Sequence, residues 1–110
     1  MAGGTADFSH YARLNERSSL MDKIRKHFEF YGRVQGVGFR YRAYHAARQF
    51  GVTGWVKNCS DGSVEMEAEG TESDIDSLIL AVEKGTFVLI ENMSVKTIPI
   101  IGSRYFEIID

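Results

Sequence analysis

The chain has 110 residues, of which 44% are hydrophobic and 25% charged, so it has the proportions of one globular domain. Its formal net charge of −2 argues against nucleic acid as a partner, because nucleic acid is captured by an excess of positive charge. Cys59 is the only cysteine, which excludes an intramolecular disulfide and a cysteine-based metal site and fits a reducing compartment. Since no apolar run approaches the length of a signal peptide or a membrane span, we expect a cytoplasmic protein without membrane contact.

The first 26 residues differ in pattern from the rest of the chain. They mix glycine, serine, arginine and glutamate with scattered aromatic residues, and they lack regular alternation. We therefore predict a poorly ordered N-terminal extension over residues 1–26 and one domain over residues 27–110. A functional arm is the alternative for the extension.

A strand and a helix are predicted at the start of the domain. Polar and apolar residues alternate from His27 to Val34, as in a strand with one buried face. Apolar residues then recur at helical spacing up to Phe50, and Gly51 stands where a C-terminal cap belongs. This pattern predicts a helix over residues 40–50.

A hairpin and a second helix are predicted next. Residues 52–58 are rich in β-branched and aromatic side chains, Asp61 and Gly62 form a turn signal, and residues 64–68 alternate again. Thr71 with Asp74 three residues later resembles a capping box, and an apolar stripe follows that ends before Gly85.

The end of the chain predicts two more strands. Residues 91–98 favour a fourth strand, Pro99 interrupts it, and residues 105–109 favour a short edge strand. The apolar segment 86–90 has no clear period and stays unplaced, with the sheet edge and a weak contact surface as alternatives.

This βαββαβ order, with one apolar stripe per helix, predicts an α+β ferredoxin-like sandwich: an antiparallel sheet with two helices on one face. The predicted core residues are Phe28, Phe30, Val34, Phe39, Ala43, Ala47, Val52, Val56, Val64, Met66, Ile75, Leu78, Ile79, Val82 and Val95.

The most informative stretch is the glycine-punctuated turn over residues 32–40. Gly36 and Gly38 allow the backbone to bend and to approach a ligand closely, and a helix starting near Arg40 would aim unpaired amides at the same point. Arg40 adds a positive charge with a planar donor fork. The turn lacks the Lys-Ser/Thr pair of a nucleotide-binding loop and the third glycine of a dinucleotide fingerprint. It therefore predicts a local anion site, with a simple connector as the alternative.

Two motifs together resemble the paired signatures of the acylphosphatase family. They are Gly32-x-Val34-Gln35-Gly36-Val37-x-Phe39-Arg40 and Gly54-Trp55-Val56-Lys57-Asn58-x-x-Asp61-Gly62-x-Val64, followed by Gly70. The resemblance covers residues 27–109 and implies a small ferredoxin-like enzyme that hydrolyses the carboxyl-phosphate bond of acyl phosphates without a metal or cofactor. Carried over by motif position, Arg40 is the phosphate-binding arginine and Asn58 positions the attacking water.

The chemistry of phosphoryl transfer agrees with that assignment. The transferred group carries charge on three outer oxygens, so catalysis depends mainly on positioning and charge stabilisation. The backbone amides of the loop are expected to hold these oxygens beside the Arg40 guanidinium; the phosphate-binding residues are Gln35, Gly36, Val37, Gly38, Phe39 and Arg40. The leaving carboxylate is a weak base and needs no general acid. Asn58 cannot accept the proton of the water, so the base stays open, with the substrate phosphate as one candidate.

The remaining reactive side chains receive no role in this prediction. His10 and His27 have no partners at metal-ligand spacing, so no metal site is assigned. His45 lies off the apolar stripe of its helix and is expected at the surface. Cys59 follows Asn58 directly and is expected to be a bystander near the site.

Two other kinds of protein share features with this chain. RNA-recognition and small-molecule sensor domains have the same element order, but an RNA reader needs basic and aromatic residues where this chain carries Glu65, Glu67 and Glu69. The N-terminal part of the hydrogenase-maturation carbamoyltransferases resembles the acylphosphatase family at the same motifs. That setting normally continues into cysteine-rich zinc modules, whereas this chain ends at Asp110, so we expect a free monomeric enzyme acting on a small acyl phosphate.

Overall fold

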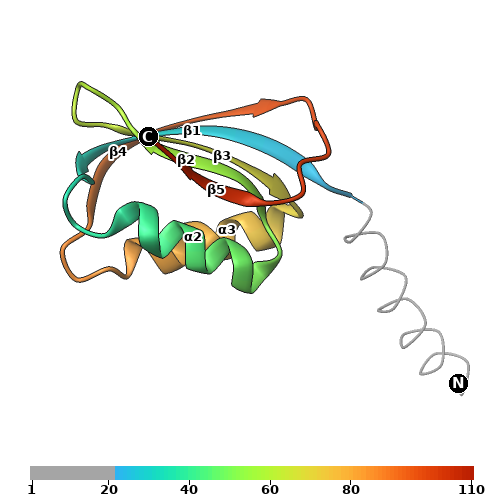
Figure 1. Cartoon of the computed structure of the whole chain (residues 1–110), viewed down its shortest axis with the longest axis horizontal. Helices are drawn as coiled ribbons and strands as arrows, with labels where there is room; N and C mark the ends of the chain where they lie inside the picture. Colours follow the sequence, from blue (N-terminus) through green and yellow to red (C-terminus); the bar gives the residue numbers. More distant parts are fainter. Residues whose placement is uncertain (1–21) are drawn as a thin grey trace, which may run out of the picture.

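The computed structural model describes residues 22–110 and consists of a five-stranded sheet with two helices packed on one face (Figure 1). Most of the extension predicted over residues 1–26 therefore lies outside the described residues. Neither helix within residues 22–110 has the length and apolar composition that are needed to cross a bilayer. The elements in chain order are β1 (Ile24–Arg33), α2 (Phe39–Phe50), β2 (Thr53–Asn58), β3 (Val64–Gly70), α3 (Glu72–Glu83), β4 (Leu89–Ile98) and β5 (Phe106–Ile109).

The sheet has the strand order β4-β1-β3-β2-β5. Antiparallel pairs join β4 to β1, β1 to β3 and β3 to β2, as predicted for the ferredoxin-like sandwich. The fifth strand lies at an edge, as expected, but it pairs in parallel with β2, so the whole sheet is mixed. This orientation arises because the chain leaves β4 at one edge and crosses the end of the sheet to reach the other.

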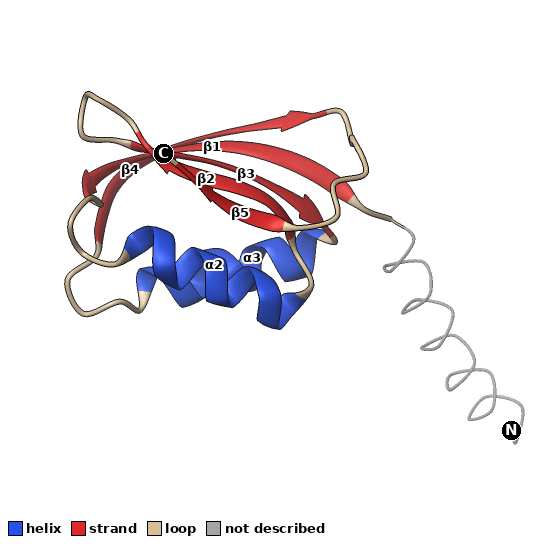
Figure 2. Cartoon of the chain, in the orientation of Figure 1, coloured by secondary structure: helices blue, strands red, loops and turns tan. Residues whose placement is uncertain are grey.

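The two helices lie side by side against one face of the sheet, and no helix of residues 22–110 covers the opposite face (Figure 2). The helix ends follow the sequence signals. The Thr71 hydroxyl accepts a hydrogen bond of 3.1 Å from the Asp74 amide at the start of α3. Gly51 ends α2 in a left-handed conformation, and its amide donates to the carbonyl oxygen of Ala47.

The core between sheet and helices contains the predicted residues with two differences. Val95 is 44% exposed, because β4 forms the outer edge of the sheet, so its assignment to the core was wrong. Ile79 is only partly buried at the margin of the core. Phe106, which was not predicted, is buried because β5 pairs with β2 opposite Gly54 and packs against α2.

Two boundaries also differ from the predicted ones. β1 begins at Ile24 rather than His27. The alternation is hidden there because the charged Lys26 shares the face of Phe28, while Arg25 lies with His27 on the open face. The unplaced segment 86–90 forms a turn and then the start of β4 at Leu89. Val88 and Ile90 pack partly against the core, whereas Phe87 is exposed.

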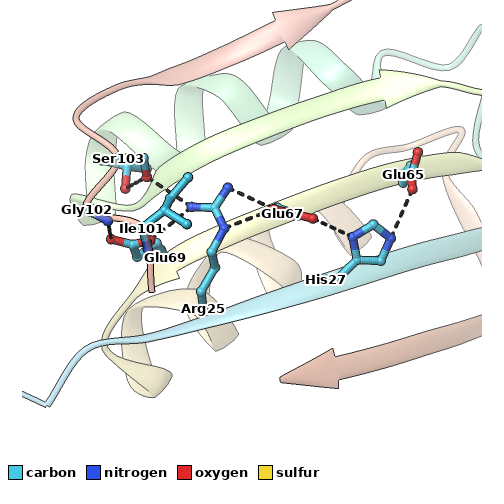
Figure 3. A network of polar contacts seen from close by, with 9 residues as sticks. Arg25, His27, Glu65, Glu67, Glu69, Ile101, Gly102 and Ser103 are labelled. Atoms are coloured by element: carbon cyan, nitrogen blue, oxygen red, sulfur yellow. Dashed lines mark hydrogen bonds and ion pairs between the residues drawn. The ribbon is translucent and has the colours of Figure 1, made fainter. Parts of the chain in front are cut away.

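The connection between β4 and β5 is attached to the open face of the sheet (Figure 3). The Glu69 carboxylate accepts hydrogen bonds from the amides of Ile101 (3.1 Å) and Gly102 (3.0 Å). Arg25 binds Glu69 at 3.0 Å and the Ser103 hydroxyl at 3.1 Å, and its side chain is only 1% exposed. These contacts set the path by which the chain enters β5.

Candidate active site

The glycine turn leads directly from β1 into α2. Gly36 and Gly38 have φ angles of +72° and +82°, in the left-handed region that side chains disfavour. A Cβ atom at either position would meet no atom within 4 Å. The turn therefore requires glycine for its backbone conformation and not for lack of space.

The N-terminus of α2 is arranged for a negative charge. The helix begins at Phe39, one residue before the predicted start, and Gly38 stands at the N-cap without a side chain that could bond the first amides. The first turn contains no acidic residue. Free amides, the positive end of the helix dipole and the Arg40 guanidinium thus act in the same region.

A pocket of about 260 Å³ joins this helix end to the end of β2. Five of the predicted site residues contribute to its wall together, although they come from two motifs about twenty positions apart. Gln35 and Val37 are not among the lining residues, and Val37 packs partly against the core. The pocket is lined by Val34, Gly36, Gly38, Phe39, Arg40, Tyr41, Asn58 and Ile108.

Asn58 is the last residue of β2 and pairs with Val64 of β3. Strand alternation places it on the helix-covered side of the sheet, after Gly54 and Val56, which are both buried. Its Oδ1 atom is buried and has no hydrogen-bond partner within the described part of the chain. A buried amide oxygen without a donor costs free energy, so this atom is available to a bound water or ligand.

Gln35 connects the two halves of the pocket. Its Nε2 donates hydrogen bonds to the carbonyl oxygens of Cys59 at 2.7 Å and Ser63 at 2.8 Å. These carbonyls belong to the loop between β2 and β3 that directly follows Asn58. The side chain of Gln35 therefore holds the glycine turn at a defined distance from Asn58, which the sequence motif alone did not indicate.

Arg40 has an ion pair with Asp110, whose Oδ1 lies 3.6 Å from Nη1. Asp110 is fully exposed and Arg40 is about one third exposed. An ion pair of this kind contributes little free energy, so it leaves the guanidinium available to an anion in the pocket.

Tyr41 and Ile108 line the pocket but were not predicted. Tyr41 follows Arg40 in the first turn of α2, so its position next to the arginine was a usable signal. Ile108 comes from β5 and reaches the pocket only through the parallel pairing with β2, for which the sequence has no local signal. Cys59 is half-buried and does not line the pocket, and His45 is exposed on α2.

A second, larger cavity of about 570 Å³ lies toward the C-terminal end of α2, between Arg48 and Arg104. None of the predicted site residues lines it. The predicted site residues that line one of these two cavities therefore all belong to the smaller pocket.

Comparison with known proteins agrees with this geometry. The profile of the acylphosphatase family matches residues 26–108. An acylphosphatase of Bifidobacterium longum is 44% identical over 79 residues, which cover 71% of this chain and 81% of that protein. An acylphosphatase of Geobacillus thermodenitrificans is 48% identical over 73 residues, covering 66% of this chain and 78% of that protein.

Solved structures give the same result. The crystal structure of acylphosphatase from Bacillus subtilis superposes with a TM-score of 0.74 at 38% identity, covering 79% of this chain and 99% of the other. The structure of T. kodakarensis HypF superposes with a TM-score of 0.69 at 33% identity over 79% of this chain, but this region is only 12% of that protein. The family profile spans both motifs and the pocket they form, and the chain therefore belongs to the acylphosphatase family, whose reaction is the hydrolysis of acyl phosphates.

Proposed function

We propose that the pocket between α2 and β2 divides the work of acyl phosphate hydrolysis between the glycine turn, Arg40 and Asn58. The observation that carries the proposal concerns Asn58, which lines the same pocket as Arg40: its Oδ1 is buried and has no hydrogen-bond partner among residues 22–110. An anion held by the arginine and the amides would leave this oxygen as the acceptor for a neighbouring water.

In this proposal, the turn over residues 35–40 binds the phosphate. The left-handed Gly36 and Gly38 present the backbone to the ligand, and the first amides of α2 add donors with the favourable end of the helix dipole. The planar Arg40 fork binds two phosphate oxygens at once. As the phosphoryl group moves from the leaving carboxylate to water, its charge stays on the outer oxygens, so the same donors stabilise the transition state.

In this proposal, Asn58 positions the attacking water. Its amide accepts a hydrogen bond from the water and orients a lone pair toward phosphorus, which removes an entropic cost from the barrier. An amide has no basic site at neutral pH, so the proton passes to another group. An oxygen of the substrate phosphate is the acceptor that the bound substrate itself provides. The leaving carboxylate departs without a proton.

Three further expectations belong to this proposal. Turnover proceeds without a metal ion, because the amides and Arg40 supply the positive charge that a metal would provide. The enzyme acts as a monomer, since all the proposed groups come from one chain. It works in the reducing cytoplasm, in keeping with its lone cysteine.

The test is phosphate release from acetyl phosphate and benzoyl phosphate in excess EDTA, with the parent chain, Arg40→Ala and Asn58→Ala. Arg40→Ala is expected to weaken inorganic phosphate binding and to lower kcat/KM about 100-fold or more. Asn58→Ala is expected to lower kcat with phosphate affinity nearly unchanged. Arg48→Ala on the same helix and Asn92→Ala on β4 are the matched controls, and both should behave as the parent.

Two results would contradict the proposal. Equal losses of phosphate affinity in Arg40→Ala and Asn58→Ala would refute the division of roles. A requirement for added metal would refute the metal-free mechanism while leaving the family assignment intact.

A further inference from the structure

The open face of the sheet carries a histidine that is surrounded by carboxylates. Spacing along the chain offered His27 no metal-ligand partner, but β1 and β3 pair so that His27 lies opposite Glu67, with Glu65 and Glu29 nearby. The Nε2 atom of His27 lies 3.0 Å from Oε2 of Glu65 and 3.9 Å from Oε2 of Glu29. One ligand atom from each of these three residues lies within 4.8 Å of the others.

The other ring nitrogen of His27 is already occupied. Nδ1 lies 2.8 Å from Oε2 of Glu67, and Oε1 of Glu67 is held at 2.9 Å by the buried Arg25 (Figure 3). With Nδ1–H donated to this carboxylate, Nε2 is the ring nitrogen that remains for a metal ion. This is the arrangement by which proteins orient a metal-binding histidine.

The two glutamates are oriented in the same manner. Oε1 of Glu65 faces Lys57 Nζ at 3.6 Å, and Oε1 of Glu29 accepts a hydrogen bond of 2.8 Å from the Tyr31 hydroxyl. In each case the second oxygen, Oε2, is the one that faces His27. Three ligand atoms therefore converge on one point while the opposite atom of every ligand is fixed by an outer partner.

A lone pair on Nε2 that faces two carboxylate oxygens is repulsive unless a positive charge lies between them. A proton on Nε2 can bond one oxygen well, whereas a metal ion serves all three atoms. Tetrahedral Zn²⁺ with bonds of about 2.1 Å keeps its ligand atoms about 3.4 Å apart. The distances of 3.0 and 3.9 Å from Nε2 to the two carboxylates bracket this value, and the two carboxylate ligand atoms lie within 4.8 Å of each other.

We propose that His27, Glu29 and Glu65 bind a divalent transition metal ion, best matched by Zn²⁺, on the sheet face opposite the helices. A cavity of about 450 Å³ lined by His27 and Glu29, together with Ser94, Lys96 and Ile98, gives solvent access to two of the three ligands. A water from this side would be the fourth ligand. The ion joins β1 to β3 and adds to the cross-strand contacts. It has no part in the phosphate chemistry, because Asn58 lies on the other face of the sheet, so the inference does not rest on the proposed mechanism.

The test is a calorimetric titration of Zn²⁺ into the full chain, prepared without a histidine tag and stripped with chelator. One Zn²⁺ per chain is expected, with a rise in unfolding temperature. His27→Gln should abolish this binding, and Glu67→Gln should weaken it about 10-fold through the loss of the orienting carboxylate. His45→Gln, which removes an exposed histidine from α2, is the matched control and should bind as the parent.

Fold integrity is checked by far-UV circular dichroism and urea unfolding, in which each variant should keep the spectrum and the cooperative transition of the parent. Glu29→Gln changes the most exposed of the three ligands, which is 43% exposed, so it should disturb the fold least. It should also weaken Zn²⁺ binding, and it provides the test if another variant folds poorly. The proposal is overturned if the parent takes up no Zn²⁺, or if folded His27→Gln or Glu29→Gln binds it as tightly as the parent. Cobalt substitution should give the visible bands of a tetrahedral site, and their absence would exclude the coordination proposed.

Discussion

The side-chain amide of Gln35 donates a hydrogen bond of 2.7 Å to the carbonyl oxygen of Cys59, the residue that follows Asn58. The same nitrogen reaches the carbonyl of Ser63 at 2.8 Å. One side chain therefore links the glycine turn, which we propose binds phosphate, to the strand end that carries Asn58, the proposed water-positioning residue. Phosphate and water have to meet in line, so this distance matters for turnover.

Gln35→Ala is accordingly expected to lower kcat/KM by about 10- to 100-fold, because small misplacements of reacting groups cost that much in rate. The free energy of unfolding should fall by only about 1–2 kcal/mol, because both carbonyls keep a backbone donor. The Gly62 amide donates to the Cys59 carbonyl, and the Cys59 amide donates to the Ser63 carbonyl. Kinetics with acetyl phosphate and urea unfolding measure the two effects. Gln49→Ala on α2 is the control. A similar loss of kcat/KM in this variant would contradict the positioning role of Gln35.

Gly38→Ala tests the backbone conformation of the turn. The left-handed φ of +82° costs an alanine about 1–2 kcal/mol, although its Cβ meets no neighbouring atom. Relaxation of that strain should move the first amides of α2 and weaken inorganic phosphate binding. Gly102→Ala is the control: Gly102 has a similar φ of +71°, so alanine should be strained there to a comparable degree, but it does not line the pocket. It should lose similar stability in thermal unfolding but keep phosphate affinity; equal phosphate losses would contradict the prediction.

Ile108→Ala tests contact with the acyl group. Ile108 lines the pocket from β5 and is 41% exposed, so it offers apolar surface to a part of the substrate that the glycine turn is not proposed to bind. We expect a higher KM for benzoyl phosphate with little change for acetyl phosphate, which has almost no apolar surface to bury. Ile109→Ala changes the next residue, which is absent from the pocket wall, and should leave the ratio of the two KM values unchanged.

Acid should destabilise the protein through Glu69. Burial alone would raise the pKa of this carboxyl, but the Ile101 amide, the Arg25 guanidinium and the Gly102 amide together hold the pKa below its ordinary value. A lowered folded-state pKa contributes stability above the unfolded-state pKa of about 4.3, and this stability is lost as the pH falls through the folded-state value. The wild-type chain should therefore lose stability between about pH 5 and pH 3.

Glu69→Gln should reduce that loss and should already cost about 3 kcal/mol at neutral pH, because Arg25 remains buried without this partner. Denaturant unfolding from pH 3 to 7 measures both effects. The exposed Glu107→Gln serves as the control and should follow the wild-type profile. An unchanged pH dependence in Glu69→Gln would show that other carboxyls account for the acid loss.

Much of the architecture could be predicted because it depends on local patterns. The alternation that begins near His27 and the apolar stripe before Gly85 identify a strand and a helix by their periods alone. Thr71 and Gly51 mark helix ends through bonds to residues within one turn. The assignment of Val95 failed because alternation shows which residues share a face of a strand but not whether a helix covers it.

Parts of the candidate site could also be predicted from the sequence, and other parts could not. The turn with Gly36, Gly38 and Arg40 could be recognised because the conformation, the helix start and the charge lie in one short segment. Its partner Asn58 came from a second motif. The cross-link made by Gln35 and the pocket wall made by Ile108 could not be predicted, because both depend on strand order and register.

The element order, most of the core residues and the family could be predicted from the sequence, since these follow from spacing along the chain and from two contiguous motifs. Which side chains meet across strands depends on the tertiary structure. The pairing of β1 with β3 buries Arg25 against Glu69 and surrounds His27 with carboxylates, and the parallel addition of β5 brings Ile108 to the wall of the candidate site. Such neighbours arise from long-range pairing, whose register is set by the packing of the whole sheet and not by any local segment.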